Sequence, residues 1–194
     1  MSQKAALKRQ LIIDQASEVF AQKGYKNVTM KDIVEACQIS RGGLYLYFSS
    51  TEELLLAVLE KLEKEPSAEI ELQRIQSSST QELLLFFFKE QKREILLKKK
   101  NLLVAKYEYG FCCREEQKSN PLRKQFDTGA LVLEKLLERG NARGEFYCED
   151  PRAQAGSIMF TLEGMKITAR TMGISENRVD REILYLMRQF VKED

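Results

Sequence analysis

Helical periodicity is the sequence feature that most restricts the fold of this chain. Apolar residues recur at intervals of three and four, as in Leu11–Ile13, Ala16, Val19 and Phe20, which is the spacing of one buried helix face. No stretch alternates apolar and polar residues over a length typical of a β-strand. The ten glycines and three prolines fall mostly between the periodic segments. The sequence therefore predicts an all-α protein with about nine helices.

The first quarter of the chain has its own pattern. Two short helices, expected at Thr29–Cys37 and Ser40–Tyr47, are separated by a tight turn and follow a longer helix at about Lys4–Lys23. This is the helix-turn-helix arrangement, whose second helix can enter the major groove of DNA. Residues 1–48 hold seven Lys or Arg against four Asp or Glu, an excess suited to a polyanion. A three-helix bundle with no DNA role fits the same pattern.

Several classes of protein are disfavoured by what the sequence lacks. It has no histidine, which excludes serine–histidine and cysteine–histidine nucleophile pairs. The four cysteines lack the paired spacing of a zinc site, and Cys112 and Cys113 cannot close a disulfide within a helix. The phosphate-binding glycine motifs are also missing. We therefore expect neither an enzyme, nor a cofactor, nor a metal site.

The cell compartment follows from the apolar runs. The longest run is Leu83–Phe88, far shorter than the roughly 20 residues of a membrane span. The first residues carry no apolar core of a signal peptide. We expect a cytoplasmic protein that does not enter a membrane.

Three segments, Gly24–Val34, Ile39–Phe48 and Ser49–Leu55, resemble the tetracycline-repressor (TetR) family of bacterial transcription regulators. The resemblance is close over residues 8–60, and Leu136–Phe146 looks like the family's close of its seventh helix. It implies a DNA-binding domain at residues 1–50 and an effector-binding and dimerisation body at 51–194. It also implies a homodimeric repressor that releases a palindromic operator in double-stranded DNA when a small molecule binds the body.

Three departures from the family pattern concern the DNA-binding head. Thr51 stands where the family often has a phosphate-binding lysine, Cys37-Gln38 replaces Ala-Gly, and Gly42 replaces a bulkier residue. The expected DNA contacts are Lys8, Thr29, Lys31, Arg41, Gly42, Tyr45, Tyr47 and Thr51. Of these, Arg41 can form a bidentate contact with guanine; its alternatives are a phosphate contact or a solvated surface position.

The expected body carries two further sites. The resemblance implies a pocket for an apolar or aromatic effector, with candidate lining residues Phe87, Tyr107, Tyr109, Phe111 and Phe126. The last two helices are expected to pair the subunits through Gly156, Gly164, Leu184, Met187 and Val191. For each set the alternative is ordinary core within one subunit.

The fourth helix, from Glu52 to about Glu65, is expected to link the body to the head and to act as the lever between them. Another class of protein remains open: an all-helical small-molecule carrier or adaptor without sequence-specific DNA binding.

Overall fold

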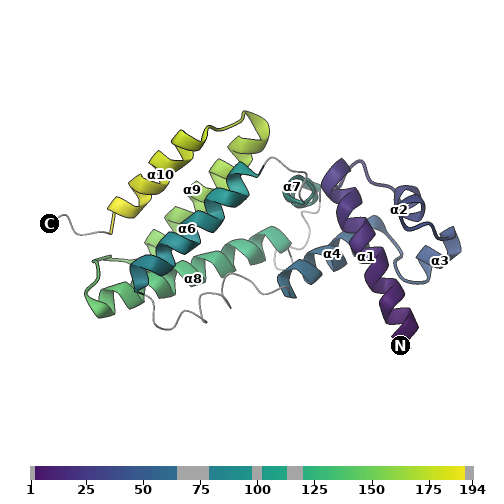
Figure 1. The fold of residues 1–194 in the computed structure, drawn as a ribbon, viewed down its shortest axis with the longest axis horizontal. Coiled ribbons are helices and arrows are strands. Elements are labelled where there is room, and N and C mark those ends of the chain that lie inside the picture. Colours follow the sequence, from purple (N-terminus) through teal and green to yellow (C-terminus); the bar gives the residue numbers. More distant parts are fainter. Residues whose placement is uncertain (1–2, 65–78, 98–101, 113–119, 191–194) are drawn as a thin grey trace. The chain divides into compact units, whose positions relative to one another are not determined.

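The structure, a computed structural model, describes residues 3–64, 79–97, 102–112 and 120–190. These residues form nine α-helices and no strand (Figure 1), which confirms the all-α class. None of the helices in these ranges combines the length and the apolar character that a bilayer crossing requires.

The chain divides into two compact units, each discontinuous in sequence. Unit 1 comprises residues 1–65 and 99–124, and unit 2 comprises residues 66–98 and 125–194. We expected a division between residues 50 and 51. In the grouping by compactness, the helices at 51–64 and 103–112 belong with the first helix, against which they pack.

Unit 1 is organised around its first helix. It contains α1 (Gln3–Lys23), α2 (Met30–Cys37), α3 (Arg41–Tyr45), α4 (Thr51–Lys64) and α7 (Leu103–Cys112). Helix α1 packs against α2, α4 and α7, and its Ile12, Ala16 and Phe20 are fully buried. These apolar residues therefore lie on one face of α1, and the packing of the other helices against α1 holds the unit together.

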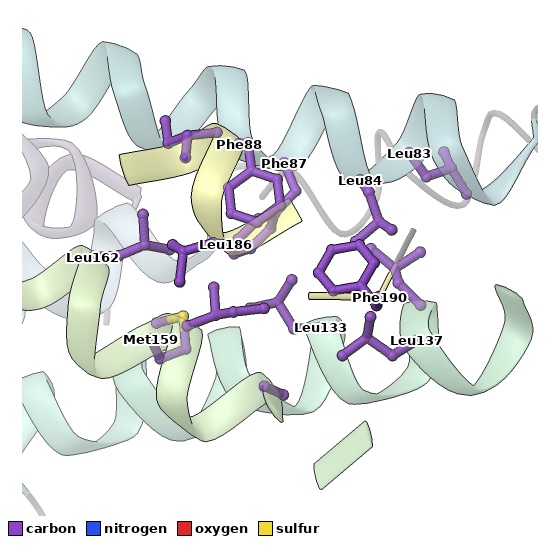
Figure 2. Packing of buried hydrophobic residues seen from close by; sticks show 14 of the residues in the cluster. Leu83, Leu84, Phe87, Phe88, Leu133, Leu137, Met159, Leu162, Leu186 and Phe190 are labelled. Atoms are coloured by element: carbon purple, nitrogen blue, oxygen red, sulfur yellow. The ribbon is translucent and has the colours of Figure 1, made fainter. Parts of the chain in front are cut away.

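In the residues that the structure describes, unit 2 is built from four helices. It contains α6 (Thr80–Leu96), most of α8 (Pro121–Arg143), α9 (Pro151–Thr171) and α10 (Glu176–Arg188). Its buried apolar residues pack together in one cluster (Figure 2), in which the labelled residues are Leu83, Leu84, Phe87, Phe88, Leu133, Leu137, Met159, Leu162, Leu186 and Phe190. Each helix contributes to this core, so the body is held mainly by apolar burial.

The start of α6 is fastened by two carboxylates. Ser79 caps the helix with Glu82 in a capping box, as the Ser-x-x-Glu spacing predicts. Glu145 accepts hydrogen bonds from the Thr80 backbone N–H at 2.7 Å and from the Thr80 hydroxyl at 2.9 Å. Burial alone would raise the pKa of Glu145, but these hydrogen bonds outweigh it and hold that pKa below its usual value.

Among the described residues of unit 2, one charged side chain is buried. Lys166 of α9 is only 1% exposed, and its Nζ lies 2.9 Å from a carboxylate oxygen of Glu94 and 2.9 Å from one of Glu163. Burial opposes the charged form, but the two carboxylates more than offset it and raise the pKa of Lys166. The ammonium therefore stays charged and joins α6 to α9.

Replacing Lys166 with alanine should destabilise unit 2 by about 3 kcal/mol, because two carboxylates lose their buried partner. Urea unfolding followed by circular dichroism measures this change. Lys89→Ala, which removes an exposed lysine of α6, is the matched control. A loss below about 1 kcal/mol for Lys166→Ala would show that the ion pair contributes no more than a surface pair.

Candidate nucleic-acid interface

The N-terminus of α2 is closed by a capping box. Thr29 accepts a hydrogen bond from the Asp32 backbone N–H at 3.3 Å, and the Asp32 carboxylate accepts from the Thr29 N–H at 2.8 Å. Lys23 lies 2.6 Å from the same carboxylate. The hydrogen bond from Lys23 and those from Thr29 lower the pKa of Asp32 to about 2. Asp32 thus fills the role that Glu or Gln has in the usual motif.

The turn between α2 and α3 explains one departure from the family pattern. Gln38 adopts φ 53 and ψ 42, the left-handed conformation in which glycine is favoured. Cys37 is buried in the core of unit 1, and burial raises the pKa of its thiol. Gln38 therefore takes the left-handed conformation at the position where the family pattern has glycine.

Helix α3 presents one face to solvent. Ser40 caps the helix by accepting from the Gly43 N–H at 3.1 Å, and Leu44 is fully buried. Arg41 and Gly42 are exposed, as is Tyr45. The guanidinium of Arg41 lies 5.8 Å from the centroid of the Tyr45 ring, within the range of a cation–π contact. Three of the predicted DNA contacts thus lie together on this face.

The other predicted DNA contacts lie on α1, on α2 and its cap, in the turn after α3 and at the start of α4. Thr29 and Lys31 are exposed at the start of α2, where Lys31 lies 3.7 Å from Glu35. Lys8 is exposed on α1, whereas Tyr47 is half-buried against the core of unit 1. Thr51 is half-buried as the first residue of α4. Of these five, Thr29, Lys31 and Lys8 are the more accessible to a phosphate.

The start of α4 differs in one detail from a standard capping box formed by Ser50 and Glu53. The Ser50 hydroxyl accepts from the Glu53 N–H at 3.1 Å, as expected. The Glu53 carboxylate, however, accepts from the Ser49 N–H at 2.7 Å and the Ser49 hydroxyl at 2.8 Å. These hydrogen bonds lower the pKa of Glu53. The Glu53 carboxylate therefore accepts a hydrogen bond from the backbone N–H of the residue that precedes the cap residue Ser50.

Helix α7 fastens the turn that precedes α2. The Glu108 carboxylate accepts hydrogen bonds from the backbone N–H groups of Tyr25 at 2.6 Å and Lys26 at 3.0 Å. Gly24 has φ +76, and a Cβ there would lie 2.5 Å from a Glu108 oxygen. Tyr109 donates to Glu52 at 3.1 Å. Sequence reasoning missed Glu108, because only the fold brings residues 25 and 108 together.

The predicted effector-lining residues fall in different units. On α7, Tyr109 is buried in the core of unit 1, Tyr107 is half-buried and Phe111 is exposed. In unit 2, Phe87 is buried in the core and Phe126 is half-buried against it. Tyr109 is thus held by Glu52 and by an edge contact with Tyr25 at 5.3 Å.

The predicted dimer residues also differ in exposure. An added Cβ at Gly156 or Gly164 of α9 would meet no atom within 4 Å. Leu184 of α10 is 56% exposed, whereas Met187 is half-buried against the core of unit 2. Val191 lies outside the described residues. Gly156, Gly164 and Leu184 are therefore the accessible members of the set.

The fold and the exposed α3 face together define a helix-turn-helix DNA-binding protein with a helical body. In the ranges that the structure describes, no cluster of three His, Cys, Asp or Glu residues could hold a metal ion.

Comparison with known proteins gives the family. The model of bacterial regulatory proteins of the tetR family matches residues 12–58, and that of the tetracyclin repressor-like C-terminal domain matches residues 83–180. The HTH-type transcriptional regulator YfiR of Bacillus subtilis (strain 168), described as uncharacterized, is 32% identical over 152 residues, or 78% of this chain and 74% of YfiR. The chain belongs to the tetR family of bacterial regulatory proteins.

Solved structures share the fold. A protein from Saccharomonospora viridis in complex with choline aligns with a TM-score of 0.81 over 97% of this chain and 100% of its own, at 17% identity. A TetR transcription regulator from Haloarcula marismortui aligns with a TM-score of 0.78 over 95% and 96%, at 16% identity. These structures show the shared fold, and membership of the tetR family shows that the chain is a DNA-binding transcriptional regulator.

The Asp32 cap should make the stability of unit 1 depend on pH. Its pKa is about 2 in the folded protein against 3.8 normally, so its contribution is present above about pH 4 and lost as pH falls through 2. The free energy of unfolding of wild type should exceed that of Asp32→Asn by about 1 kcal/mol at pH 6, and this difference should shrink as the pH falls from about 4 through 2. Urea midpoints across this range measure it. A pH-independent difference contradicts the prediction, and Glu138→Gln on α8 serves as control.

Removing the Glu108 carboxylate should destabilise unit 1 by about 2 kcal/mol, because two backbone N–H groups lose a charged acceptor. Glu108→Gln should lose less, since its amide oxygen can still accept. Thermal and urea unfolding measure both variants, with Glu18→Ala on the exposed side of α1 as control. The carboxylate is removed by Glu108→Ala. If this variant were as stable as wild type, the hydrogen bonds from Glu108 to the turn before α2 would not stabilise unit 1.

Proposed function

We propose that this protein is a homodimeric repressor that binds a palindromic operator through α3 and releases it when a small molecule binds the helical body. The observation that carries this proposal is the exposed face of α3, where Arg41 and Tyr45 lie together on a helix braced by buried contacts. An α-helix of this kind fits the major groove of B-DNA.

The contacts divide into base reading and phosphate binding. Arg41 reads guanine through its O6 and N7 atoms, because its guanidinium presents paired donors at the start of α3. Lys8 and Lys31 bind phosphates, as do the hydroxyls of Tyr45 and Tyr47. At Thr29, whose hydroxyl donates to Asp32, a phosphate is bound by N–H groups at the start of α2. Thr51 contributes a hydroxyl without charge. Gly42 allows the backbone of α3 to approach the base edges closely.

Pairing of two subunits matches the two-fold symmetry of a palindrome. The exposed α9 face with Gly156 and Gly164 allows close helix approach, and Phe160, on the same helix, is 72% exposed. On α10, Leu184 and Tyr185 are 56% and 64% exposed. We assign the subunit interface to these faces of α9 and α10.

The effector site belongs to unit 2 in this proposal. Phe87 and Phe126 supply apolar and aromatic surface. The side-chain oxygen of Gln91, one turn beyond Phe87 on α6, is buried and has no hydrogen-bond partner among the described residues. An effector with apolar surface and one hydrogen-bond donor would suit this environment. The effector is the small molecule whose addition releases the protein from the operator, and this release is the assay that identifies it.

The cytoplasm is the proposed compartment, since a regulator must reach the chromosome. We propose no catalytic role, because the regulator function needs none and the sequence has no histidine.

Arg41→Ala should weaken binding to a selected duplex about 5- to 150-fold, the effect of losing one bidentate base contact. The duplex is selected from random sequence by the wild-type protein, and affinity is measured against salt concentration. Lys89→Ala, at an exposed position of α6, should bind as wild type. Selection of no duplex at low salt would overturn the repressor and favour a carrier or adaptor.

Leu184→Asp should halve the mass in solution, since a charge would lie in an apolar subunit interface. Analytical ultracentrifugation compares it with the 22.5 kDa chain mass and with Leu85→Asp, an exposed leucine of α6. A Leu184→Asp protein that remains dimeric would remove α10 from the interface.

A further inference from the structure

A leucine extends the exposed face of α3. Leu46 follows the helix directly and keeps helical backbone angles, φ −68 and ψ −20, and its N–H donates to the Gly42 carbonyl at 3.2 Å. Its side chain therefore lies one turn beyond Gly42, on the same side of the helix. Leu46 is 83% exposed, whereas Leu44 is fully buried.

The chemistry of this face is divided in two. Arg41 and Tyr45 supply hydrogen-bond donors. Gly42 has no side chain, and an added Cβ would meet no atom within 4 Å. Leu46 can neither donate nor accept a hydrogen bond with its side chain. The surface formed by Gly42 and Leu46 therefore has no hydrogen-bonding side chain, and an apolar group is the partner that it can contact favourably.

The major groove of B-DNA offers one apolar group, the C5 methyl of thymine. A charged or hydrogen-bonding base edge would lose water against Leu46 without gaining a partner. A phosphate would gain nothing from it. Within a DNA complex, the thymine methyl is thus the group that Leu46 can contact favourably.

We propose that Leu46 determines sequence specificity by packing against a thymine methyl in each half of the operator. This inference rests on the proposed function. Arg41 and Leu46 are five residues apart, about 7.5 Å along a helix axis. The thymine should therefore lie within about two or three base pairs of the guanine that Arg41 contacts.

Deoxyuridine tests this proposal directly, because it lacks only the C5 methyl of thymidine. In the duplex selected by wild type, symmetric thymine pairs are replaced by deoxyuridine one pair at a time. At one pair of positions, wild-type affinity should fall about fourfold per half-site, as expected for one methyl group. Leu46→Ala should bind the thymine duplex more weakly and should not respond to deoxyuridine at that pair.

Controls separate this effect from a change in folding. Leu46 is exposed, so the thermal midpoint of Leu46→Ala should match wild type. Leu85→Ala, an exposed leucine on α6, should retain both the affinity and the response to deoxyuridine. Leu46→Met should restore part of the response, because its side chain can still reach an apolar group.

Three results would overturn the inference. The first is a wild-type protein whose affinity does not change when deoxyuridine replaces thymine at any position. The second is a Leu46→Ala protein that loses as much affinity as wild type on each of these replacements. A wild-type protein that selects no duplex overturns the proposed function itself, and this inference with it. Specific binding without any methyl dependence overturns the role of Leu46 alone.

Discussion

Burial of one face of α1 is the constraint on which the DNA-binding unit depends. Ile12, Ala16 and Phe20 are fully enclosed, and α2, α4 and α7 all pack on this helix. Helix α3 has five residues, which is too short to be stable alone. Its exposed face therefore has a defined direction only because α1 and its partners hold the flanking turns in place.

Hydrogen bonds to backbone groups complete what apolar burial begins. Asp32, Glu53 and Glu108 each accept from backbone N–H groups at or beside a helix end. Such groups are left without partners at every helix N-terminus and in tight turns. Apolar packing has little directional preference, whereas these carboxylates fix the backbone at specific residues. The orientation of the α3 face thus depends on carboxylates whose hydrogen-bond partners lie within unit 1.

Local sequence was sufficient for the helices and for the helix-turn-helix. Periodicity and capping residues such as Thr29 and Ser79 act within a few positions, so the sequence shows them directly. The family resemblance then supplied the α3 face. The position of Tyr109 could not be predicted from local sequence. A tyrosine suits a ligand pocket as well as a core, and only tertiary packing places Tyr109 beside Tyr25. Glu108 was missed for the same reason: its partners lie 82 and 83 positions away.

The discontinuity of unit 1 bears on how such proteins can diverge. The chain leaves this unit at about residue 65 and returns to it for residues 99–124. A gene exchange that replaced only the first 65 codons would place a foreign turn opposite Glu108, and an ill-fitting residue at position 24 would meet its carboxylate. A point substitution on α3 can therefore change operator preference without disturbing the fold of unit 1, whereas exchange of the N-terminal segment alone would disturb it.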